Sequence, residues 1–332
     1  MNNAHTLIIA EAGVNHNGDM DTAFKMIDVA KDAGVDIVKF QTSITSTSKF
    51  SEKAKYQKET TGEKGTQLDM IKKLRFSFEQ HRIIKEYCDQ IGIQYLSTPF
   101  DFESIDFLNN LGCDFWKVPS GEIVNVPYLR KIGKTGKNII MSTGIGTMEE
   151  IERALQILRE SGAGSITLLQ CTTEYPTPYE DINLRAMKTL RDNFGLDVGL
   201  SDHSMGIEVP IAAVAMGASV IEKHFTLSRE MPGPDQKASI EPDELKAMVS
   251  SIRHIEAALG DGKKQPHAGE IENRHISRKS IVASRDIKKG EKFSEENIVP
   301  RHAGKGISPA YWDDVIGKEA IRDFIEDEMI EL

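Results

Sequence analysis

The sequence has few cysteines, no long apolar run and no excess of positive charge, and each absence excludes a class of protein. The cysteines among its 332 residues are Cys88, Cys113 and Cys171. They stand too far apart to form a disulfide framework or a zinc-ligand motif, so we expect three buried thiols.

No stretch reaches the roughly 18 to 20 apolar residues that are needed to cross a bilayer. The first 25 residues lack a basic segment that leads into an apolar run and a small-residue cleavage site. We therefore expect a cytoplasmic protein that does not bind membranes. The net charge of -10 argues against a nucleic-acid partner, because binding phosphates needs a concentrated positive face.

A short β-branched apolar run followed by an amphipathic stretch occurs eight times before residue 262. Each run is almost continuously apolar, as expected of parallel strands buried on both faces. The runs begin at Leu7, Asp36, Ile93, Asp114, Asn138, Ser165, Leu196 and Ser219. Eight β-then-α units predict an α/β fold, a (β/α)8 TIM barrel. An open doubly wound sheet is the alternative, which the eight-fold count fits less well.

The composition divides the chain into three parts. We expect a barrel at residues 1–262, a linker at 263–276, and a small domain of short strands and turns at 277–332. Residues 43–78 form a polar, lysine-rich insertion between the second predicted strand and its helix. Such an insertion lies on the face where TIM barrels build active sites, so it is expected to cover substrate or support an oligomer contact.

Nearly every predicted strand ends in polar side chains. The carboxyl ends of barrel strands form one rim, where catalytic groups lie, so we expect these side chains to converge there. The strand-end residues are Glu11, Asn15, His16, Lys39, Gln41, Ser97, Thr98, Lys117, Ser120, Glu122, Ser142, Thr143, Thr172, Thr173, Ser201, Asp202, His203, Glu222 and His224.

Two lysines on this rim suggest an anion site. Lys39 and Lys117 would bring ammonium groups to the centre, where the hydroxyls of Thr98, Ser142 and Ser201 add neutral donors. This set suits a ligand that carries both a phosphate and a carboxylate. The alternative is a structural role, in which the two lysines pair with Glu11 and Glu122.

Two histidines on the same rim suggest a metal site. His203 and His224 end adjacent predicted strands, whose backbones are about 4.8 Å apart in a sheet. Two imidazoles with open positions beside them suit a divalent transition metal that acts as a Lewis acid on a carbonyl oxygen. A buried structural histidine is the alternative for either residue.

The chain resembles the bacterial sialic acid synthase family over nearly its full length. The matching pieces are AEAGVNHNG at 10–18, VKFQT at 38–42, LSTPFD at 96–101, WKVPSGE at 116–122, STG at 142–144, TEYPTPYED at 173–181, GLSDHS at 199–204, IEKHFTL at 221–227 and GPD at 233–235. Residues 278–298, RKSIVASRDIKKGEKFSEENI, resemble the core of that family's antifreeze-like (SAF) domain of the β-clip type.

The resemblance implies that phosphoenolpyruvate condenses with the open-chain aldehyde of N-acetylmannosamine to give N-acetylneuraminate and phosphate. It implies Mn2+, or Mg2+ or Co2+, held by His203 and His224, and Glu11 as the catalytic carboxylate that stabilises positive charge at C2. The implied phosphoenolpyruvate contacts are Lys39, Thr98, Lys117, Ser120, Ser142, Thr173 and Ser201. The implied sugar contacts are Gln41, Glu122, Tyr175, Asp235 and Arg301.

The resemblance also implies a domain-swapped homodimer, in which Arg301 reaches the barrel of the partner subunit. The chain departs from the family pattern at two places. Residues 301–306 read ArgHisAlaGlyLysGly where a shorter ArgProGly stretch is expected, which leaves the loop geometry open. Gln170 stands where many relatives carry histidine, and glutamine cannot carry a proton near neutral pH.

Four other functions stay open at this point. An N,N'-diacetyllegionaminate synthase would run the same reaction on 2,4-diacetamido-2,4,6-trideoxymannose, through only a few different pocket contacts. A phosphorylated sugar would suit basic residues in the insertion at 43–78. A non-catalytic sugar-binding barrel would not need the metal histidines and phosphate lysines that are present. An aldolase with a Schiff-base lysine could use Lys39 or Lys117.

Overall fold

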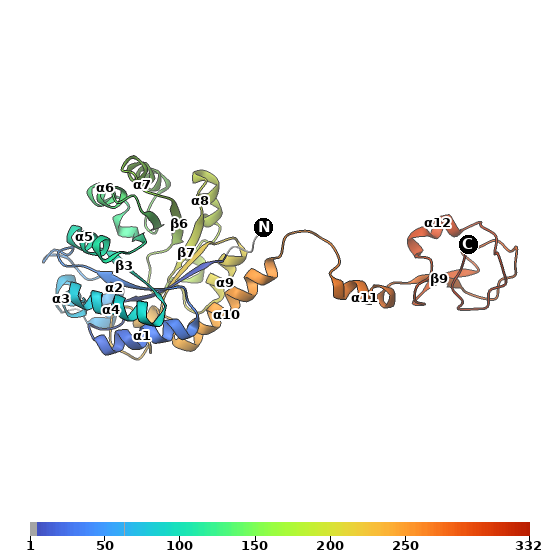
Figure 1. Ribbon diagram of the computed structural model, residues 1–332, viewed down its shortest axis with the longest axis horizontal. Coiled ribbons are helices and arrows are strands. Elements are labelled where there is room, and N and C mark those ends of the chain that lie inside the picture. Colours follow the sequence, from blue (N-terminus) through green and yellow to red (C-terminus); the bar gives the residue numbers. More distant parts are fainter. Residues whose placement is uncertain (1–4, 63) are drawn as a thin grey trace. The chain divides into compact units, whose positions relative to one another are not determined.

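The computed structural model describes residues 5–62 and 64–332, and the chain forms two compact units, Met1–Asp261 and Gly262–Leu332 (Figure 1). Each unit has its own apolar core. The units meet in sequence one residue before the expected end of the barrel at 262. Most of the expected linker at 263–276 is occupied by helix α11 (Ala268–Ser277), which the sequence did not predict.

The first unit is a barrel of eight parallel strands. Their hydrogen-bonded order is β3-β2-β1-β8-β7-β6-β5-β4, and the end strands β3 and β4 also contact each other. The strands are β1 (Leu7–Gly13), β2 (Ile37–Thr42), β3 (Gln94–Pro99), β4 (Phe115–Val118), β5 (Asn138–Ser142), β6 (Ile166–Cys171), β7 (Val198–Asp202) and β8 (Val220–His224). The predicted TIM barrel is therefore confirmed.

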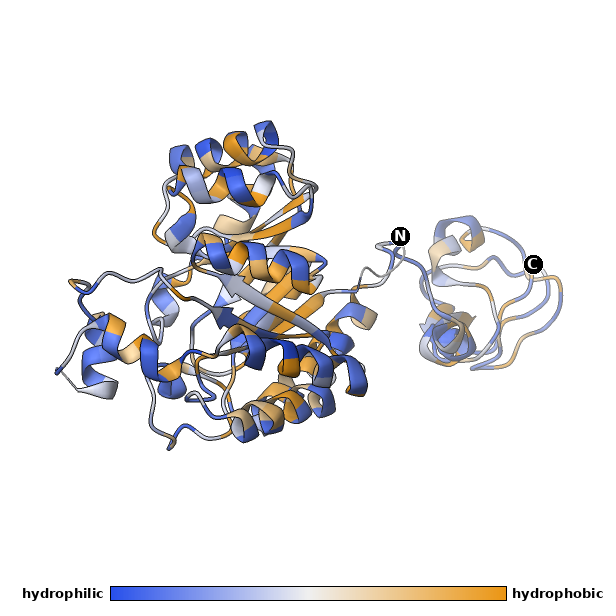
Figure 2. Ribbon diagram, turned by 60° about the vertical axis from the view of Figure 1, so that its left-hand side comes forward, coloured by the Kyte–Doolittle hydropathy of each residue, from blue (hydrophilic) through white to orange (hydrophobic). Residues whose placement is uncertain are grey.

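Helices surround the strands and bury one face against them. They are α1 (Met20–Ala33), α4 (Phe78–Ile91), α5 (Phe102–Leu111), α6 (Val126–Gly133), α7 (Met148–Glu160), α8 (Ala186–Phe194), α9 (Glu208–Ala215) and α10 (Pro242–Leu259). Figure 2 shows orange apolar and blue polar residues on different sides of these helices, as packing on a sheet requires. The capping box predicted at Thr147 and Glu150 is present at the start of α7.

Inside the barrel, each strand turns alternate residues toward the axis. Strand residues on this side form a buried apolar cluster: Ile9, Ile37, Leu96, Ile140, Leu169 and Val220. Two positions further along the same strands stand Glu11, Lys39, Thr98, Ser142, Cys171 and Glu222. Because the side-chain period of a strand is two, an apolar floor lies directly beneath a polar rim. Gly199 is part of this floor, since a Cβ there would lie 2.2 Å from the carbonyl oxygen of Val220.

The insertion at 43–78 folds into two short helices, α2 (Lys55–Thr61) and α3 (Gln67–Leu74), before α4 begins. Four single-turn 3-10 helices, at Ser120–Glu122, Tyr179–Asp181, Gln236–Ala238 and Pro309–Tyr311, shape other loops of the described chain.

The second unit contains mostly turns and short strands, as expected from residue 278 onward. Strands β9 (Ser280–Ala283) and β10 (Ile298–Arg301) pair antiparallel, and α12 (Trp312–Val315) follows them. Its core includes Ile281, Phe293 and Phe324, and the two phenyl rings meet edge to face at 5.9 Å. This small core is made of residues of the second unit alone, as in a separate domain.

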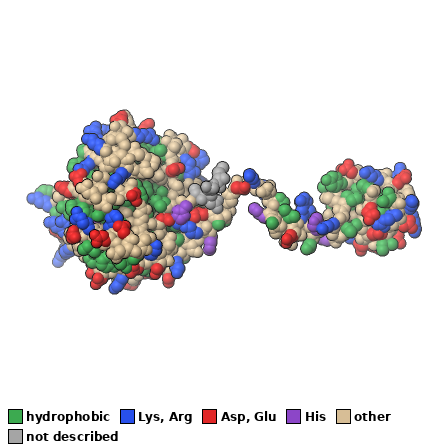
Figure 3. All heavy atoms as spheres, in the orientation of Figure 1, with side chains coloured by type: hydrophobic (Ala, Val, Ile, Leu, Met, Phe, Trp, Pro, Cys, Tyr) green, Lys and Arg blue, Asp and Glu red, His purple; other side chains and the backbone are tan. Residues whose placement is uncertain are grey.

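The surface carries charges of both signs, as the view in Figure 3 shows. Across residues 5–62 and 64–332, none of the helices has both the length and the apolar character needed to cross a membrane. Cys88, Cys113 and Cys171 are buried free thiols, as predicted.

Candidate active site

Four charged side chains meet inside the barrel, directly above the apolar floor. Lys39 Nζ lies 2.7 Å from Oε2 of Glu11 and 3.7 Å from Oε2 of Glu222. Lys117 Nζ lies 3.5 Å from Oε1 of Glu222. All four residues are buried. Charges are costly to bury unless they are paired. The attraction between the two lysines and the two glutamates offsets this cost.

Hydroxyl groups complete the surroundings of the lysines. Lys39 Nζ donates to Thr98 Oγ1 at 2.9 Å, and Lys117 Nζ donates to Ser142 Oγ at 2.7 Å. Ser201 Oγ donates to Oε1 of Glu222 at 3.1 Å. These groups line one cavity, together with Ser120 and Thr173. The structure thus brings together all seven residues that the sequence assigned to phosphoenolpyruvate.

The two lysines support the two carboxyl groups unequally. Burial opposes ionisation of Glu222, but Lys117 and Lys39 together hold its pKa below the usual value. Burial dominates at Glu11 and raises the pKa of that carboxyl against the attraction of Lys39. Burial lowers the pKa of Lys117, whereas Glu11 and Glu222 raise the pKa of Lys39 in spite of its burial. Glu11 is therefore the carboxyl of the pair that takes up a proton more readily.

Glu222 is a residue whose importance the sequence did not reveal. It was recognised as a strand-end residue but received no role. It bridges both lysines and accepts a hydrogen bond from Ser201. The available signal was its position two residues before His224, which places both side chains on the same face of β8.

His203 and His224 stand beside this cluster, with ring centroids 5.5 Å apart. Nδ1 of His203 lies 2.7 Å from the carbonyl oxygen of Thr172, so this nitrogen carries the hydrogen and leaves the Nε2 lone pair free. Among the described residues, Nδ1 of His224 has no hydrogen-bond partner. Burial, with His203 nearby, lowers the pKa of His224 well below its usual value, so its imidazole is neutral.

Burial opposes a charge on His203, but Cys171 and the carbonyl oxygen of Thr172 raise its pKa above the usual value. In their neutral forms the two imidazoles fit the donor set of an open metal site. Across residues 5–62 and 64–332, no group of three or more His, Cys, Asp and Glu side chains is arranged to hold a metal ion. A metal bound by two histidines would therefore take its remaining ligands from substrate or water, as catalytic sites with open positions do.

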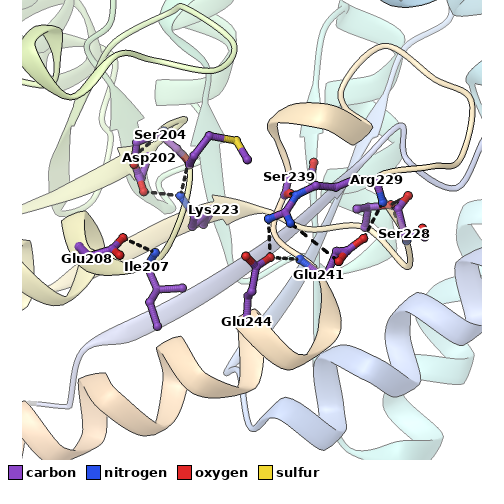
Figure 4. Close-up of polar contacts among 12 residues, drawn as sticks. Asp202, Ser204, Ile207, Glu208, Lys223, Ser228, Arg229, Ser239, Glu241 and Glu244 are labelled. Atoms are coloured by element: carbon purple, nitrogen blue, oxygen red, sulfur yellow. Dashed lines mark hydrogen bonds and ion pairs between the residues drawn. The ribbon is translucent and has the colours of Figure 1, made fainter.

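The same strand ends carry a second ion pair that faces away from the cavity. Lys223 Nζ lies 2.5 Å from Oδ2 of Asp202 and donates to the carbonyl oxygen of Ser204 at 2.7 Å (Figure 4). Oδ1 of Asp202 accepts from the backbone N–H of Ser204 at 2.9 Å. Since Asp202 precedes His203 and Lys223 precedes His224, this pair ties together the backbone on which both imidazoles stand.

A second cavity adjoins the first and contains four of the five residues assigned to the sugar. Gln41, Tyr175 and His224 line both cavities, together with Phe100. Glu122 and Asp235 line the second cavity alone. Burial raises the pKa of Asp235 to about 6, and nearby Glu11 adds to this effect.

The loop after β8 is held by a buried polar network that places Asp235. Asn15 Nδ2 donates to Ser239 Oγ at 2.8 Å, and Ser239 Oγ donates to the carbonyl oxygen of Asp235 at 2.7 Å. Gln236 Nε2 donates to the carbonyl oxygen of Asn15 at 2.9 Å. Figure 4 shows Arg229 at the other end of the loop, where its Nε donates to the carbonyl oxygen of Ser239. Asn15 therefore positions the loop.

Tyr175 stands between the two cavities and is held by aromatic contacts. Its ring centroid lies 4.0 Å from that of His203 and 4.9 Å from that of Tyr56, a residue of α2. Tyr56 lines the second cavity, and the sequence did not single it out. Tyr56 belongs to the insertion at 43–78, so this segment forms part of the wall of the second cavity. Of the two roles expected for the insertion, this position agrees with that of covering substrate.

Some strand-end residues do not converge on the rim, so that expectation is wrong for part of the set. Ser97 lies 2.7 Å from Thr42 Oγ1 on the outer side of β3, and Asp202 faces outward with Lys223. His16 stacks on Phe76 with ring centroids 3.9 Å apart. Strand pleating explains the first two, since residues at odd spacing along a strand point to opposite faces.

Arg301 belongs to the second unit. It lies at the end of β10 and forms an ion pair with Asp327 of the same unit.

Two family models match the chain. The model described as the NeuB family matches residues 26–264, and the model described as the SAF domain matches residues 278–331.

Curated relatives and a solved structure are similar over most of the chain. The N,N'-diacetyllegionaminic acid synthase of Campylobacter jejuni subsp. jejuni serotype O:2 is 51% identical and covers 98% of both chains. The N,N'-diacetyllegionaminic acid synthase of Legionella pneumophila is 46% identical, over 93% of this chain and 89% of that protein. The crystal structure of the N-acetylneuraminic acid synthetase of Leptospira borgpetersenii in complex with citrate has a TM-score of 0.71 and 36% identity, over 82% of this chain and 91% of that one.

Proposed function

The chain is an enzyme of the NeuB family, a synthase with a C-terminal SAF domain, and from this premise we propose that it condenses phosphoenolpyruvate with 2,4-diacetamido-2,4,6-trideoxymannose. The products are N,N'-diacetyllegionaminate and phosphate. One observation supports this reaction above all. A lysine-lined cavity and a second polar cavity meet at Gln41, Phe100, Tyr175 and His224, so two substrates can touch there.

The first cavity suits phosphoenolpyruvate. Lys39 and Lys117 supply charge-assisted hydrogen bonds for its phosphate and carboxylate, and Thr98, Ser142 and Ser201 add neutral donors. Ion pairs with Glu11 and Glu222 hold the two buried lysines in place. Donors that are already oriented and buried form stronger contacts with an incoming anion. Glu222 keeps the two ammonium groups close together in spite of their like charge.

His203 and His224 are the residues that would hold a divalent ion such as Mn2+, Mg2+ or Co2+. When bound, such an ion would polarise the aldehyde oxygen of the sugar. Thr172 fixes the tautomer of His203 through its carbonyl oxygen, which leaves Nε2 free to bind the ion. Glu122 and Asp235 lie in the adjoining cavity, where they can hold the hydroxyl and amide groups of the sugar.

Glu11 has the chemistry for the charged stage of the reaction. When C3 of phosphoenolpyruvate attacks the aldehyde carbon, positive charge develops at C2, and a nearby carboxylate stabilises it until water adds. Glu11 lines the phosphoenolpyruvate cavity, and Gln41 Nε2 donates to its Oε1 at 3.0 Å. Loss of phosphate from the resulting tetrahedral carbon leaves the ketone of the product acid.

The similarities favour the diacetamido sugar over N-acetylmannosamine, the acceptor that the sequence alone favoured. The two curated legionaminic acid synthases are 51% and 46% identical to the chain, whereas the N-acetylneuraminic acid synthetase structure is 36% identical. N-acetylneuraminate synthesis is thus the second candidate. We further propose a cytoplasmic homodimer in which Arg301 of one subunit completes the sugar site of the other.

Phosphate release from phosphoenolpyruvate tests the function directly. Purified protein with Mn2+ is given the diacetamido sugar and N-acetylmannosamine in parallel. Preference for the first sugar supports the proposal, and preference for the second makes the protein an N-acetylneuraminate synthase. If neither sugar supports phosphate release, both proposed acceptors are contradicted.

A further inference from the structure

Helix α3 has an apolar stripe that is only partly buried. Its residues Met70, Ile71 and Leu74 follow the spacing of one helix face, which begins at Gln67. All four residues line the sugar cavity, and none is fully buried. An amphipathic helix normally packs such a stripe against protein. Here the stripe instead forms the wall of a cavity, so it is positioned to meet the occupant of that cavity.

The position of the reacting carbon decides which part of the sugar meets this wall. The new bond joins C3 of phosphoenolpyruvate to C1 of the sugar, so C1 must lie where the two cavities meet. That place is marked by Gln41, Tyr175 and His224. Met70, Ile71 and Leu74 line the sugar cavity but not the phosphoenolpyruvate cavity. These three residues thus lie outside the reacting end of the sugar cavity, where C6, the far end of the open-chain sugar, can be received.

We propose that Met70, Ile71 and Leu74 select the acceptor by receiving a methyl group at C6 and disfavouring a hydroxymethyl group there. The inference rests on the proposed function, since it assigns the end of the same sugar. The diacetamido-trideoxy sugar has a methyl group at C6, whereas N-acetylmannosamine has a hydroxyl there. A hydroxyl placed against these three apolar side chains loses its water, and none of the three offers it a hydrogen-bond partner.

Met70 and Leu74 also separate the sugar cavity from a neighbouring cavity. Both residues, with Pro234, line the two cavities at once. Lys64 and Lys73 line the neighbouring cavity. A larger polar group at C6 would have to pass this partition to reach these lysines. The partition therefore explains how one helix excludes such acceptors while leaving the reacting end of the site unchanged.

The test compares acceptors that differ only at C6. The pairs are 2,4-diacetamido-2,4,6-trideoxymannose with its 6-hydroxy counterpart, and 2-acetamido-2,6-dideoxymannose with N-acetylmannosamine. We expect wild-type protein to favour the 6-deoxy member by about 10- to 100-fold in kcat/KM, as apolar pockets do for an added hydroxyl. Met70→Gln and Leu74→Asn each introduce a polar partner of similar size and should reduce this ratio to about threefold or less.

Leu68→Asn is the matched control, because Leu68 is an apolar, half-buried residue of α3 that lines neither cavity. It should leave the ratio unchanged. Binding of the reduced sugars, which carry an alcohol at C1 and cannot react, is measured by calorimetry with the same variants. Equal binding of 6-deoxy and 6-hydroxy alditols to wild type, or an unchanged ratio in both Met70→Gln and Leu74→Asn, would overturn the inference.

The two measurements separate this inference from the proposed function. If wild-type protein releases phosphate with the diacetamido sugar but shows no preference at C6, the synthase stands and the role of α3 is wrong. If no acceptor supports phosphate release, the proposed condensation is wrong. The alditol measurement then still decides whether α3 recognises C6.

Discussion

Strands β7 and β8 carry two buried ion-pair arrangements that face opposite ways. Glu222 points into the barrel, where Lys39 and Lys117 lie 3.7 and 3.5 Å from its oxygens. The next residue, Lys223, points outward and lies 2.5 Å from Asp202. Both arrangements are shielded from water, so each must offset the cost of burying charge.

The two arrangements differ in how completely their charges are paired. Lys223 has both a carboxylate and the carbonyl oxygen of Ser204 as acceptors, and Asp202 also accepts from the Ser204 N–H. The inward lysines share Glu222 at 3.7 and 3.5 Å beside an open cavity, and Lys39 has a closer partner in Glu11 at 2.7 Å. The outward pair is thus complete without a ligand, whereas the inward charges retain the capacity to bind an anion. Changes to the first should affect stability, and changes to the second should affect activity.

Replacing an inward lysine should produce the largest effect of all, and it should be on activity. We expect Lys39→Met to lower kcat/KM for phosphoenolpyruvate by about 10²- to 10³-fold, because a charge-assisted contact in a dry site is lost. Stability should fall less than in the loss of an outward charge, since the raised pKa of Glu11 makes it easier for this carboxyl to lose its charge when its partner is removed. Phosphate release and urea unfolding on the same preparation measure both. Activity within about tenfold of wild type would contradict the anion site.

Breaking the outward pair should mainly lower stability. We expect Lys223→Met to reduce the free energy of unfolding by about 3 to 5 kcal/mol, because it leaves Asp202 buried without a counter-charge. The double variant Lys223→Met with Asp202→Asn removes both charges and keeps an oxygen for the Ser204 N–H. It should recover much of the loss in urea unfolding. A double variant as unstable as the single one would show that the charge is not the cause.

His81 is a buried titratable group that stays neutral near pH 7, unlike the buried ion pairs. Nε2 and Nδ1 of His81 lie 3.2 Å from Thr42 Oγ1 and 2.9 Å from the Tyr95 hydroxyl, and burial lowers its pKa to about 4. In the unfolded chain, the imidazole of His81 takes up a proton near pH 6.5. The stability that neutral His81 contributes to the folded state is therefore fully present above that pH. We expect about 3 kcal/mol to be lost as the pH falls from 6.5 toward 4.

Urea unfolding of wild type and His81→Gln across this pH range measures that contribution. Glutamine can replace the two hydrogen bonds but does not titrate. The variant should therefore lose less stability than wild type between pH 6.5 and pH 4. Identical pH dependence in the two proteins would show that His81 is not responsible.

The smallest effect on stability is expected in the second unit. Arg301 and Asp327 are partly exposed, and such pairs contribute about 0 to 1 kcal/mol. Arg301→Ala should therefore leave thermal unfolding almost unchanged. If Arg301 completes the sugar site, as proposed, the same variant should raise KM for the sugar while KM for phosphoenolpyruvate stays near its wild-type value. Unchanged sugar kinetics would remove Arg301 from the site.

Local patterns made much of the barrel and the rim predictable. Eight apolar runs were sufficient to predict eight parallel strands, and the rim followed because parallel strands in a barrel end on one side. Lys39, Lys117 and the two histidines were found this way. The same rule also selected Ser97 and Asp202, which face outward, because position at a strand end does not by itself specify the face.

Other residues could be identified only from contacts between distant segments. Tyr56 and Met70 lie in an insertion whose sequence is polar and lacks a strong pattern, and Glu222 stood among many strand-end candidates. Their roles depend on neighbours far along the chain, such as Tyr175 beside Tyr56 and Lys39 beside Glu222.

The sequence by itself determined the alternation of strands and helices, the small second domain and the residue types on the rim, because these depend on short-range periodicity and composition. The tertiary structure alone decided that Glu222 bridges Lys39 and Lys117, which come from other strands. It also decided that α3 forms a wall of the second cavity. The physical reason is that the partners of a side chain and the wall of a cavity are set by packing between segments far apart in the chain.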